Sequence, residues 1–369
     1  MRRILKIFKW APLFVVVFAC VDPIHVDVSL PGNTIIIDGS ITDGPPPYSV
    51  KLAHAFALDA DSTANRPIEG AKVVLYSDAH ESEELVYDTL GAYRSTGKIQ
   101  GTVGRTYYIR IEMPDGSTCE SEPETIQPSG RIKAINYVFE HRTATLSYGV
   151  VDADVFNIYV DADGENKDTY YMRWRYSGTY RTETNPELHT ITSQGYTYMD
   201  PWPCSGYVVD PAPNGGILRQ DTACTCCVCW VRNFEATPRL SDSELVTEGQ
   251  FRNVKVAEVP ITRRTFIEKF YVQIEQMAIS KNAFDFFKIT RSQKQNLTNL
   301  FQPAPGRHVG NIKTVDAKQT VVGLFWAASI TKAAIFIPRS AVPYNLARDI
   351  IPFPCTAFPF STTTQPPYW

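Results

Sequence analysis

The sequence lacks the short motifs that mark common catalytic and nucleotide-binding sites. It contains no G-x-S-x-G nucleophile elbow, no G-x-x-x-x-G-K-[ST] phosphate loop and no G-x-G-x-x-G dinucleotide motif. Its 6 histidines form no H-E-x-x-H pair, the pattern of many zinc hydrolases. A Ser-His-Asp triad could be assembled from distant residues, but nothing in the chain favours one. We therefore expect a protein that is not an enzyme and uses no cofactor or metal.

The chain also lacks a strong charge bias and, after residue 20, an apolar run of membrane-spanning length. Its 36 basic and 39 acidic side chains give a formal net charge of −3, without a basic stripe that would predict nucleic acid as a partner. The most apolar late stretch, 333–342, is interrupted by Pro338 and Arg339, whereas a spanning helix needs about 20 apolar residues. Internal repeats are absent as well.

The N-terminal residues resemble a signal peptide followed by a lipid-attachment site. Basic residues precede an apolar run over 10–19, which is about half the length of a membrane-spanning helix. Residues 17–20 read V-F-A-C, close to a bacterial lipobox, in which a small residue precedes the acylated cysteine. We expect cleavage after residue 19 and lipidation, palmitate included, of Cys20, with each buried methylene contributing about 0.8 kcal/mol. The alternative is an ordinary signal peptide with a chance cysteine.

Residues 20–33 are expected to form a tether between the lipid and the folded protein. Val21 follows the lipid cysteine, whereas the retention signal of enteric inner-membrane lipoproteins has Asp at that place. The sequence therefore favours a lipid anchor in the outer membrane. It leaves open whether the protein faces the periplasm or the cell surface.

The remaining composition predicts a mainly β protein with two domains. Tyr (19), Phe (19) and Pro (26) are frequent, which favours strands and turns. Residues 34–128 contain short alternating strands such as 48–52, and a Pro-Asp-Gly turn at 114–116. Turns at intervals of about 8 to 12 residues indicate an Ig-like or fibronectin-like antiparallel β-sandwich.

Residues 131–345 are expected to form a larger β-rich second domain with one helix. Ser280 is a suitable N-cap, and 281–299 contains neither Gly nor Pro, so we predict a helix over 280–299. Apolar stretches at 321–328 and 333–337 are interpreted as strands that close this domain. The Pro- and Thr-rich tail, 346–369, is expected to be irregular.

Most of the cysteines are clustered in a predicted loop over 200–230. Without Cys20 seven cysteines remain, and an exported chain favours disulfides. Adjacent cysteines in an extended segment point to opposite sides, so Cys226 and Cys227 should pair with different partners, drawn from Cys204, Cys119 or Cys355. A soft-metal site is the alternative, although C-x-C-C-x-C differs from the two separated C-x₂-C arms of structural zinc sites. The candidate disulfide or metal cluster comprises Cys204, Cys224, Cys226, Cys227 and Cys229.

Aromatic side chains gather between residues 170 and 207. Strand alternation can bury half of them, and the others could form a surface for a partner protein, a sugar or a peptide. Ordinary core packing is the alternative. The candidate binding surface comprises Tyr171, Trp174, Tyr176, Tyr198 and Trp202.

An acidic stretch that starts at Asp161 resembles the opening of a calcium loop. An EF-hand would need Glu at its twelfth position, where this chain has Met172, so we interpret the stretch as an acidic turn. The carboxylates of Asp161, Asp163 and Glu165 are the candidate acid and base of an alternative hypothesis, a surface hydrolase of glycan or peptide.

Several motifs in order along the chain resemble the domain-of-unknown-function 4249 family of Bacteroidota outer-membrane lipoproteins. They include Ile37-Asp38-Gly39, Pro47-Tyr48, Gly101 with Gly104, Pro114-Asp115-Gly116, Tyr170-Tyr171, Arg173-Trp174, Ile279-Ser280 and Gly310-Asn311-Ile312. The resemblance implies an accessory lipoprotein that accompanies a TonB-dependent receptor of the starch-utilisation C type and assists ligand capture or transporter assembly. It brings no catalytic residues. A purely structural envelope component is the further alternative.

Overall fold

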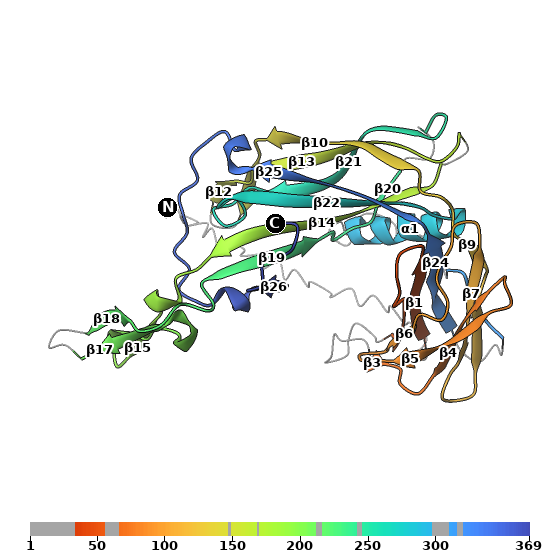
Figure 1. Cartoon of the computed structure of the whole chain (residues 1–369), viewed down its shortest axis with the longest axis horizontal. Coiled ribbons are helices and arrows are strands. Elements are labelled where there is room, and N and C mark those ends of the chain that lie inside the picture. The colour runs from red at the N-terminus through yellow and green to blue at the C-terminus, as the bar shows by residue number, and fades with distance from the viewer. Residues whose placement is uncertain are drawn as a thin grey trace, which may run out of the picture.

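The computed structural model describes residues 34–55, 66–146, 149–167, 170–211, 216–241, 246–296, 310–315 and 320–369. The expected signal peptide, the tether and Cys20 lie outside these ranges. The described chain is mainly β with a single α-helix, α1 (Lys281–Asn296), which confirms the predicted fold class. Two β-sheet bodies and a thin arm make up the molecule (Figure 1). Within the described ranges, no helix has both the length and the apolar content to cross a membrane.

The first body is one curled sheet around one core. Its apolar centre includes Ile37, Leu52, Tyr93, Ile109 and Phe325, all at most 1% exposed. Along the sheet the strand order is β23 (Ile312–Thr314), β8 (Thr118–Ser121), β7 (Thr106–Glu112), β4 (Lys72–Ser77), β5 (Ser82–Tyr87), β6 (Ala92–Arg94), β2 (Ser49–His54), β1 (Thr34–Thr42) and β24 (Thr320–Ala328), with β3 (Arg66–Pro67) beside β2 and β9 (Glu124–Thr125) beside β7.

The two ends of this sheet meet and nearly close it into a barrel. Gly310 forms a parallel bridge with Gly323, and a Cβ atom on Gly310 would lie 1.6 Å from the Gly323 carbonyl oxygen. Beside them the Asn311 amide holds the backbone of Phe325, donating to its carbonyl at 2.7 Å and accepting from its N–H at 2.9 Å. Only glycine allows this approach, so the closure depends on Gly310.

Two expectations about the first domain are corrected by this sheet. We assigned 321–328 to the second domain, but β24 pairs with β1 across nine residue pairs, from Thr34–Thr320 to Thr42–Ala328. The pair is parallel, so the sheet is not purely antiparallel, and the structure does not confirm a detailed Ig-like sandwich. The physical reason is that strand pairing between the two ends of the chain has no local sequence pattern.

The second body is a sandwich of two sheets. One contains β10 (Arg131–Glu140), β13 (Val155–Asp163) and β21 (Gln250–Pro260) in that order. The other has the order β25 (Ile330–Pro338), β22 (Lys269–Ala278), β14 (Met172–Glu183), β19 (Val228–Phe234) and β26 (Ser361–Thr362), with β20 (Arg239–Leu240) beside β14. Phe156, Trp174, Phe266 and Phe270 fill the space between the sheets and are at most 1% exposed. The hairpin of β11 (Thr143–Leu146) and β12 (Gly149–Asp152) extends from one end.

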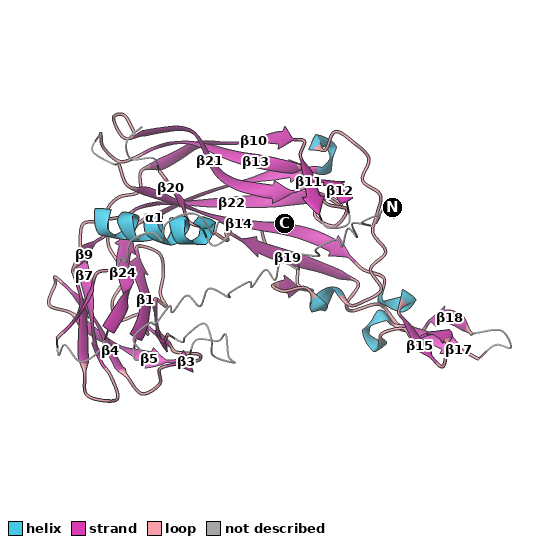
Figure 2. Cartoon of the chain, turned by 180° about the vertical axis from the view of Figure 1, so that it is seen from behind, coloured by secondary structure: helices cyan, strands magenta, loops and turns pink. Residues whose placement is uncertain are grey.

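The arm consists of two short hairpins that project from the second body (Figures 1 and 2). The first joins β15 (Thr190–Ser193) to β16 (Tyr196–Met199), and the second joins β17 (Tyr207–Asp210) to β18 (Ile217–Gln220). Two 3₁₀ turns, Pro186–Leu188 and Pro203–Ser205, connect them to each other and to the body. The expected loop over 200–230 therefore contains regular structure.

One extended segment passes from the first body into the second. β24 and β25 are separated only by Ser329, and Figure 1 shows them as a continuous blue ribbon. Residues 126–130, which link β9 to β10, are fixed beside this segment. The Ser129 N–H donates to Ser329 Oγ at 2.6 Å, and the buried Gln276 amide donates to the Ser129 carbonyl at 2.7 Å. The two bodies are thus joined by a strand and by a second, hydrogen-bonded crossing.

The helix covers this junction. Ser280 caps it as predicted, accepting the Ala283 N–H at 3.1 Å. Phe287 packs edge-to-face on Trp326 of β24, with the ring centroids 5.8 Å apart, so the helix lies against this strand. Residues 297–299, the predicted last turn, lie outside the described ranges. The tail after residue 346 is mainly irregular, but β26 pairs with β19 and Trp369 packs on Trp230.

A buried carboxyl group lies where the first body meets the helix. Glu124 is 3% exposed, and its Oε1 accepts from Ser280 Oγ at 3.0 Å and from Asn311 Nδ2 at 3.2 Å. Its Oε2 has no hydrogen-bond partner among the described residues. Burial raises the pKa of Glu124 to about 7, against the lowering effect of these hydrogen bonds and with a further increase from Glu122.

This carboxyl makes stability depend on pH. In the unfolded chain it ionises near its ordinary value of 4.5, but in the folded protein it keeps its proton up to about pH 7. The free energy of unfolding should therefore fall by about 3 kcal/mol as the pH rises from about 4.5 to above 7. Glu124→Gln should remove this part of the pH dependence, as measured by urea unfolding at pH 5 and pH 8. Glu84→Gln, at an exposed position on β5, is the control; equal pH dependence in wild type and Glu124→Gln would contradict the interpretation.

Candidate binding surfaces

The clustered cysteines form disulfides. Cys204 pairs with Cys226, Cys224 with Cys227, and Cys229 with Cys355. The adjacent Cys226 and Cys227 have different partners, as their opposite directions predicted. Cys119 is a buried thiol in the core of the first body. Within the described ranges, no group of three or more His, Cys, Asp or Glu side chains is arranged to hold a metal ion.

The disulfides have two different tasks. Cys204–Cys226 and Cys224–Cys227 lie at the base of the arm, where the Thr225 N–H also donates to the Cys204 carbonyl at 2.9 Å. Cys229–Cys355 is fully buried and ties β19 to the C-terminal tail across 126 residues of sequence. The first two therefore hold the arm, and the third holds the second body to its tail.

The arm presents apolar side chains to solvent. Its hairpins are too thin to enclose a core of their own, so large side chains remain outside. Tyr198 is 50% exposed and Trp202 41% exposed, which leaves both available to a partner. The other exposed apolar side chains of the arm are Leu188, Ile191, Tyr196, Met199, Val208 and Ile217. Such a concentration on one projecting element is typical of a protein-binding surface.

The other three residues of the expected aromatic surface lie elsewhere. Trp174 is fully buried and donates to Gln276 Oε1 at 3.0 Å, and Tyr176 is 6% exposed, so their assignment to an exposed surface is wrong. The reason is strand alternation: both share the inward face of β14, whereas Arg173 and Arg175 take the outward face. Tyr171 packs on Phe284 of the helix at 5.1 Å. In the sequence, Arg173 and Arg175 alternate with Trp174 and Tyr176, and this pattern indicates that the aromatic side chains face the core.

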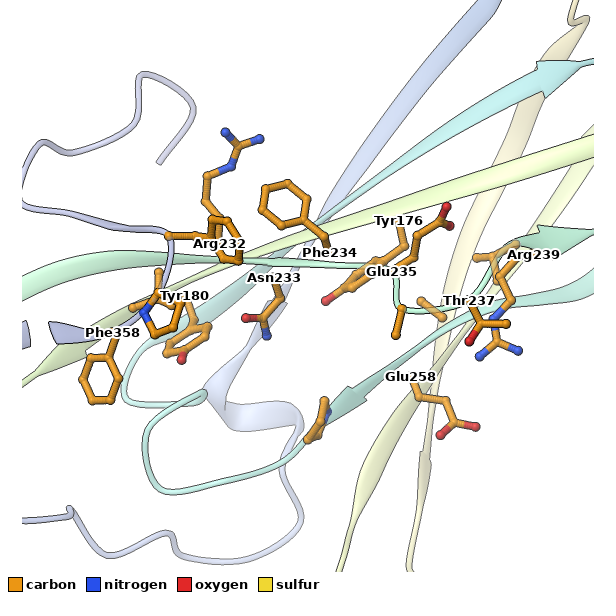
Figure 3. A pocket seen from close by; sticks show the side chains of 17 residues that line it. Tyr176, Tyr180, Arg232, Asn233, Phe234, Glu235, Thr237, Arg239, Glu258 and Phe358 are labelled. Carbon is orange, nitrogen blue, oxygen red and sulfur yellow. The ribbon is translucent and has the colours of Figure 1, made fainter. Parts of the chain in front are cut away.

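A cleft of about 710 Å³ opens in the second body. It lies between β19 of one sheet and β21 of the other. β21 is an edge strand, and β19 has only the short β26 on its outer side. The tail closes the cleft at Phe358–Phe360. Tyr176 and Tyr180 of β14 project into it below β19 (Figure 3). The Tyr176 hydroxyl is buried without a hydrogen-bond partner in the described structure, and burial raises its pKa.

Charged and aromatic groups surround this cleft. Glu235 accepts from Arg173 Nη2 at 2.8 Å, and both side chains of this ion pair are 12% exposed. Arg232 lies over the Phe234 ring at 5.1 Å and has no carboxylate partner among the described residues. Phe234 and Phe360 are 48% and 68% exposed and contact each other edge-to-face at 5.2 Å. Sequence reasoning missed these residues, because single phenylalanines in separate segments carry no motif.

The carboxylates of the hydrolase alternative do not face this cleft. Asp161 and Asp163 lie in β13, so the expected turn starts after them. Lys133 and Arg252 form ion pairs with Asp163 at 2.5 and 3.0 Å, and together they lower its pKa. Asp161 accepts the Asn253 N–H at 2.7 Å. These contacts join β10, β13 and β21 to one another.

Comparison with known families assigns the chain. The family model described as "Domain of unknown function (DUF4249)" matches residues 21–334. The chain belongs to the DUF4249 family. No curated protein matches it. The DUF4249 match includes the whole first body and the arm and ends within β25, so the tail that closes the cleft at Phe358–Phe360 lies beyond it.

Removal of the long-range disulfide should destabilise this DUF4249 chain as a whole. A link that closes a loop of this length contributes about 5 kcal/mol, chiefly by restricting the unfolded chain. The double variant Cys229→Ala with Cys355→Ala should therefore unfold at a lower urea concentration. Circular dichroism measures this midpoint.

The matched comparison is Cys204→Ala with Cys226→Ala, whose loop spans 22 residues and lies at the arm. This pair should lower the midpoint by less, because a shorter loop restricts the unfolded chain less, and it should make the arm more sensitive to protease. Equal midpoints for the two double variants would contradict the separate roles of the disulfides.

Proposed function

We propose that this DUF4249 chain is an outer-membrane lipoprotein that acts as an accessory subunit of a TonB-dependent receptor. It assists ligand capture or assembly of the transporter and performs no catalysis itself. The lipobox-like residues 17–20 support an anchor at Cys20, and the family resemblance to Bacteroidota lipoproteins supports the receptor as partner.

The observation that carries the proposal is the arm. It extends away from both bodies and holds exposed Tyr198 and Trp202 on a frame closed by two disulfides. A rigid aromatic surface loses little conformational entropy on binding, and Tyr and Trp are enriched where interfaces gain most of their free energy. Three disulfides also suit an oxidising compartment outside the cytoplasm.

Replacement of the arm aromatics should release the receptor. When the tagged protein is purified from outer membranes in mild detergent, a β-barrel receptor should co-purify. Tyr198→Ser with Trp202→Ser should weaken this association at least about tenfold, because removal of a buried aromatic anchor costs about 2 kcal/mol or more. Val86→Ser with Val138→Ser, exposed on the two bodies, is the control. Recovery of unrelated proteins alone, or equal loss in both variants, would count against the proposal.

The anchor is tested separately. Cys20→Ser should move the protein from the membrane fraction to the soluble fraction, and mass spectrometry of the wild type should find a diacylglycerol on residue 20. Cys119→Ala, a change to the buried thiol of the first body, should leave the protein in the membrane. An unmodified thiol at residue 20 with the leader still attached would overturn the assignment.

A further inference from the structure

The cleft of the second body combines an apolar interior with an unfinished sheet edge. β19 pairs with β14 along its whole length, but its other side pairs with β26 only at Trp230 and Val231. The Arg232 N–H then donates to the Phe360 carbonyl at 3.1 Å, and the tail pairs no further along the strand. The outer side of β19 is therefore occupied up to Arg232 and open beyond it.

The open side presents backbone hydrogen-bonding groups. The Glu235 N–H donates to the Tyr176 carbonyl of β14 at 3.2 Å, so the backbone N–H of residue 235 points toward β14. Alternation in an antiparallel ladder then directs the N–H and carbonyl of Phe234 outward, on the same side as the N–H of Arg232. No described residue takes either group of Phe234. Unpaired groups at an edge are a template for an added strand.

The space next to this edge suits side chains from such a strand. Successive residues of a strand point to opposite faces, so every second side chain would enter the cleft. There it would meet Tyr180, Phe358 and Val256, and the Tyr176 hydroxyl would be within the same apolar interior. The intervening side chains would lie on the outer face beside Arg232 and Phe234, which Figure 3 shows on the opposite side of β19 from Tyr176 and Tyr180.

Charge decides what the outer face prefers. The two carboxylates that line the cleft are already engaged, Glu235 with Arg173 and Glu258 with Arg142 and Lys255. Arg232 is exposed and has no carboxylate within ion-pair distance in the described chain. The tail occupies the position directly across from Arg232, but diagonal neighbours in an antiparallel pair are within reach of long side chains, and opposite charges there attract. An acidic side chain next to the edge is therefore the complement that this surface lacks.

We propose that the second body binds an extended peptide, which adds as a β-strand to β19 beyond β26 and inserts alternate apolar side chains into the cleft. The acidic residues between them pair with Arg232. This peptide site lies on the body rather than on the arm, and it requires neither the lipid anchor nor the receptor. Both the ligand class and the pairing geometry follow from the open edge rather than from the proposed function.

A blocked hexapeptide that alternates valine and glutamate is the probe. With a fluorescent label it should bind the purified protein saturably, and hydrogen exchange should slow in the segment 232–236. The same peptide with its pairing amides N-methylated keeps its side chains but cannot form the ladder, so it should lose binding by more than about tenfold. Equal binding of the two peptides would show an apolar cleft without strand addition and would overturn the proposal.

A charge exchange tests the register. Arg232→Glu should weaken binding of the valine–glutamate peptide about fivefold and strengthen binding of the matching valine–lysine peptide by a similar factor. Arg66→Glu, an exposed reversal on β3 of the first body, should change neither. Because Arg232 is exposed, the variant should keep the wild-type circular dichroism spectrum.

Two further outcomes would also overturn the proposal. One is the absence of saturable binding together with unchanged exchange at 232–236. The other is self-association through this edge, seen as a doubled sedimentation mass that Arg232→Glu abolishes. Because the experiment uses the purified protein alone, its failure is distinct from failure to recover a receptor.

Discussion

A single extended segment constrains the whole molecule, because β24 pairs with β1 in the first body and runs through Ser329 directly into β25 of the second. An extended chain that is hydrogen-bonded on both sides of one residue has little freedom to bend there. Asp43 strengthens the crossing by accepting the Ile330 N–H at 2.8 Å. The direction of the second body, and with it the positions of the cleft and the arm, is therefore set by strand pairing in the first.

Outside this frame, stability comes from different sources in different parts. The two bodies rely on apolar cores, with Ile37, Leu52 and Tyr93 in one and Trp174 with Phe270 in the other. The arm has no comparable core, since its large side chains face solvent. Cross-links take that role, as they do in small extracellular domains that cannot bury enough apolar surface. The apolar side chains of the arm therefore stay exposed and can contact a partner.

Local features were predictable from the sequence and long-range ones were not. The alternation at 48–52, the turn at 114–116 and the Ser280 cap depend on neighbouring residues, and each is found in the structure. The partner of 321–328 depends on a strand near the other end of the chain. The same holds for the candidate sites. The export context predicted disulfides, and the adjacency of Cys226 and Cys227 predicted different partners for them, but the full pairing stayed open. The cleft joins β14, β19, β21 and the tail, which share no local pattern.

The placement of β24 in the first body also determines when each part can fold. A ribosome releases the chain from its N-terminus, yet the first sheet lacks its last strand until residue 328 has been made. The second sheet waits longer, because β26 and the partner of Cys229 lie at residues 355–362. Neither body can therefore complete its sheets before the last part of the chain has been made. Until then the strands that later pair with β24 and β26 have an unpaired edge, and such an edge is a template for pairing with another chain.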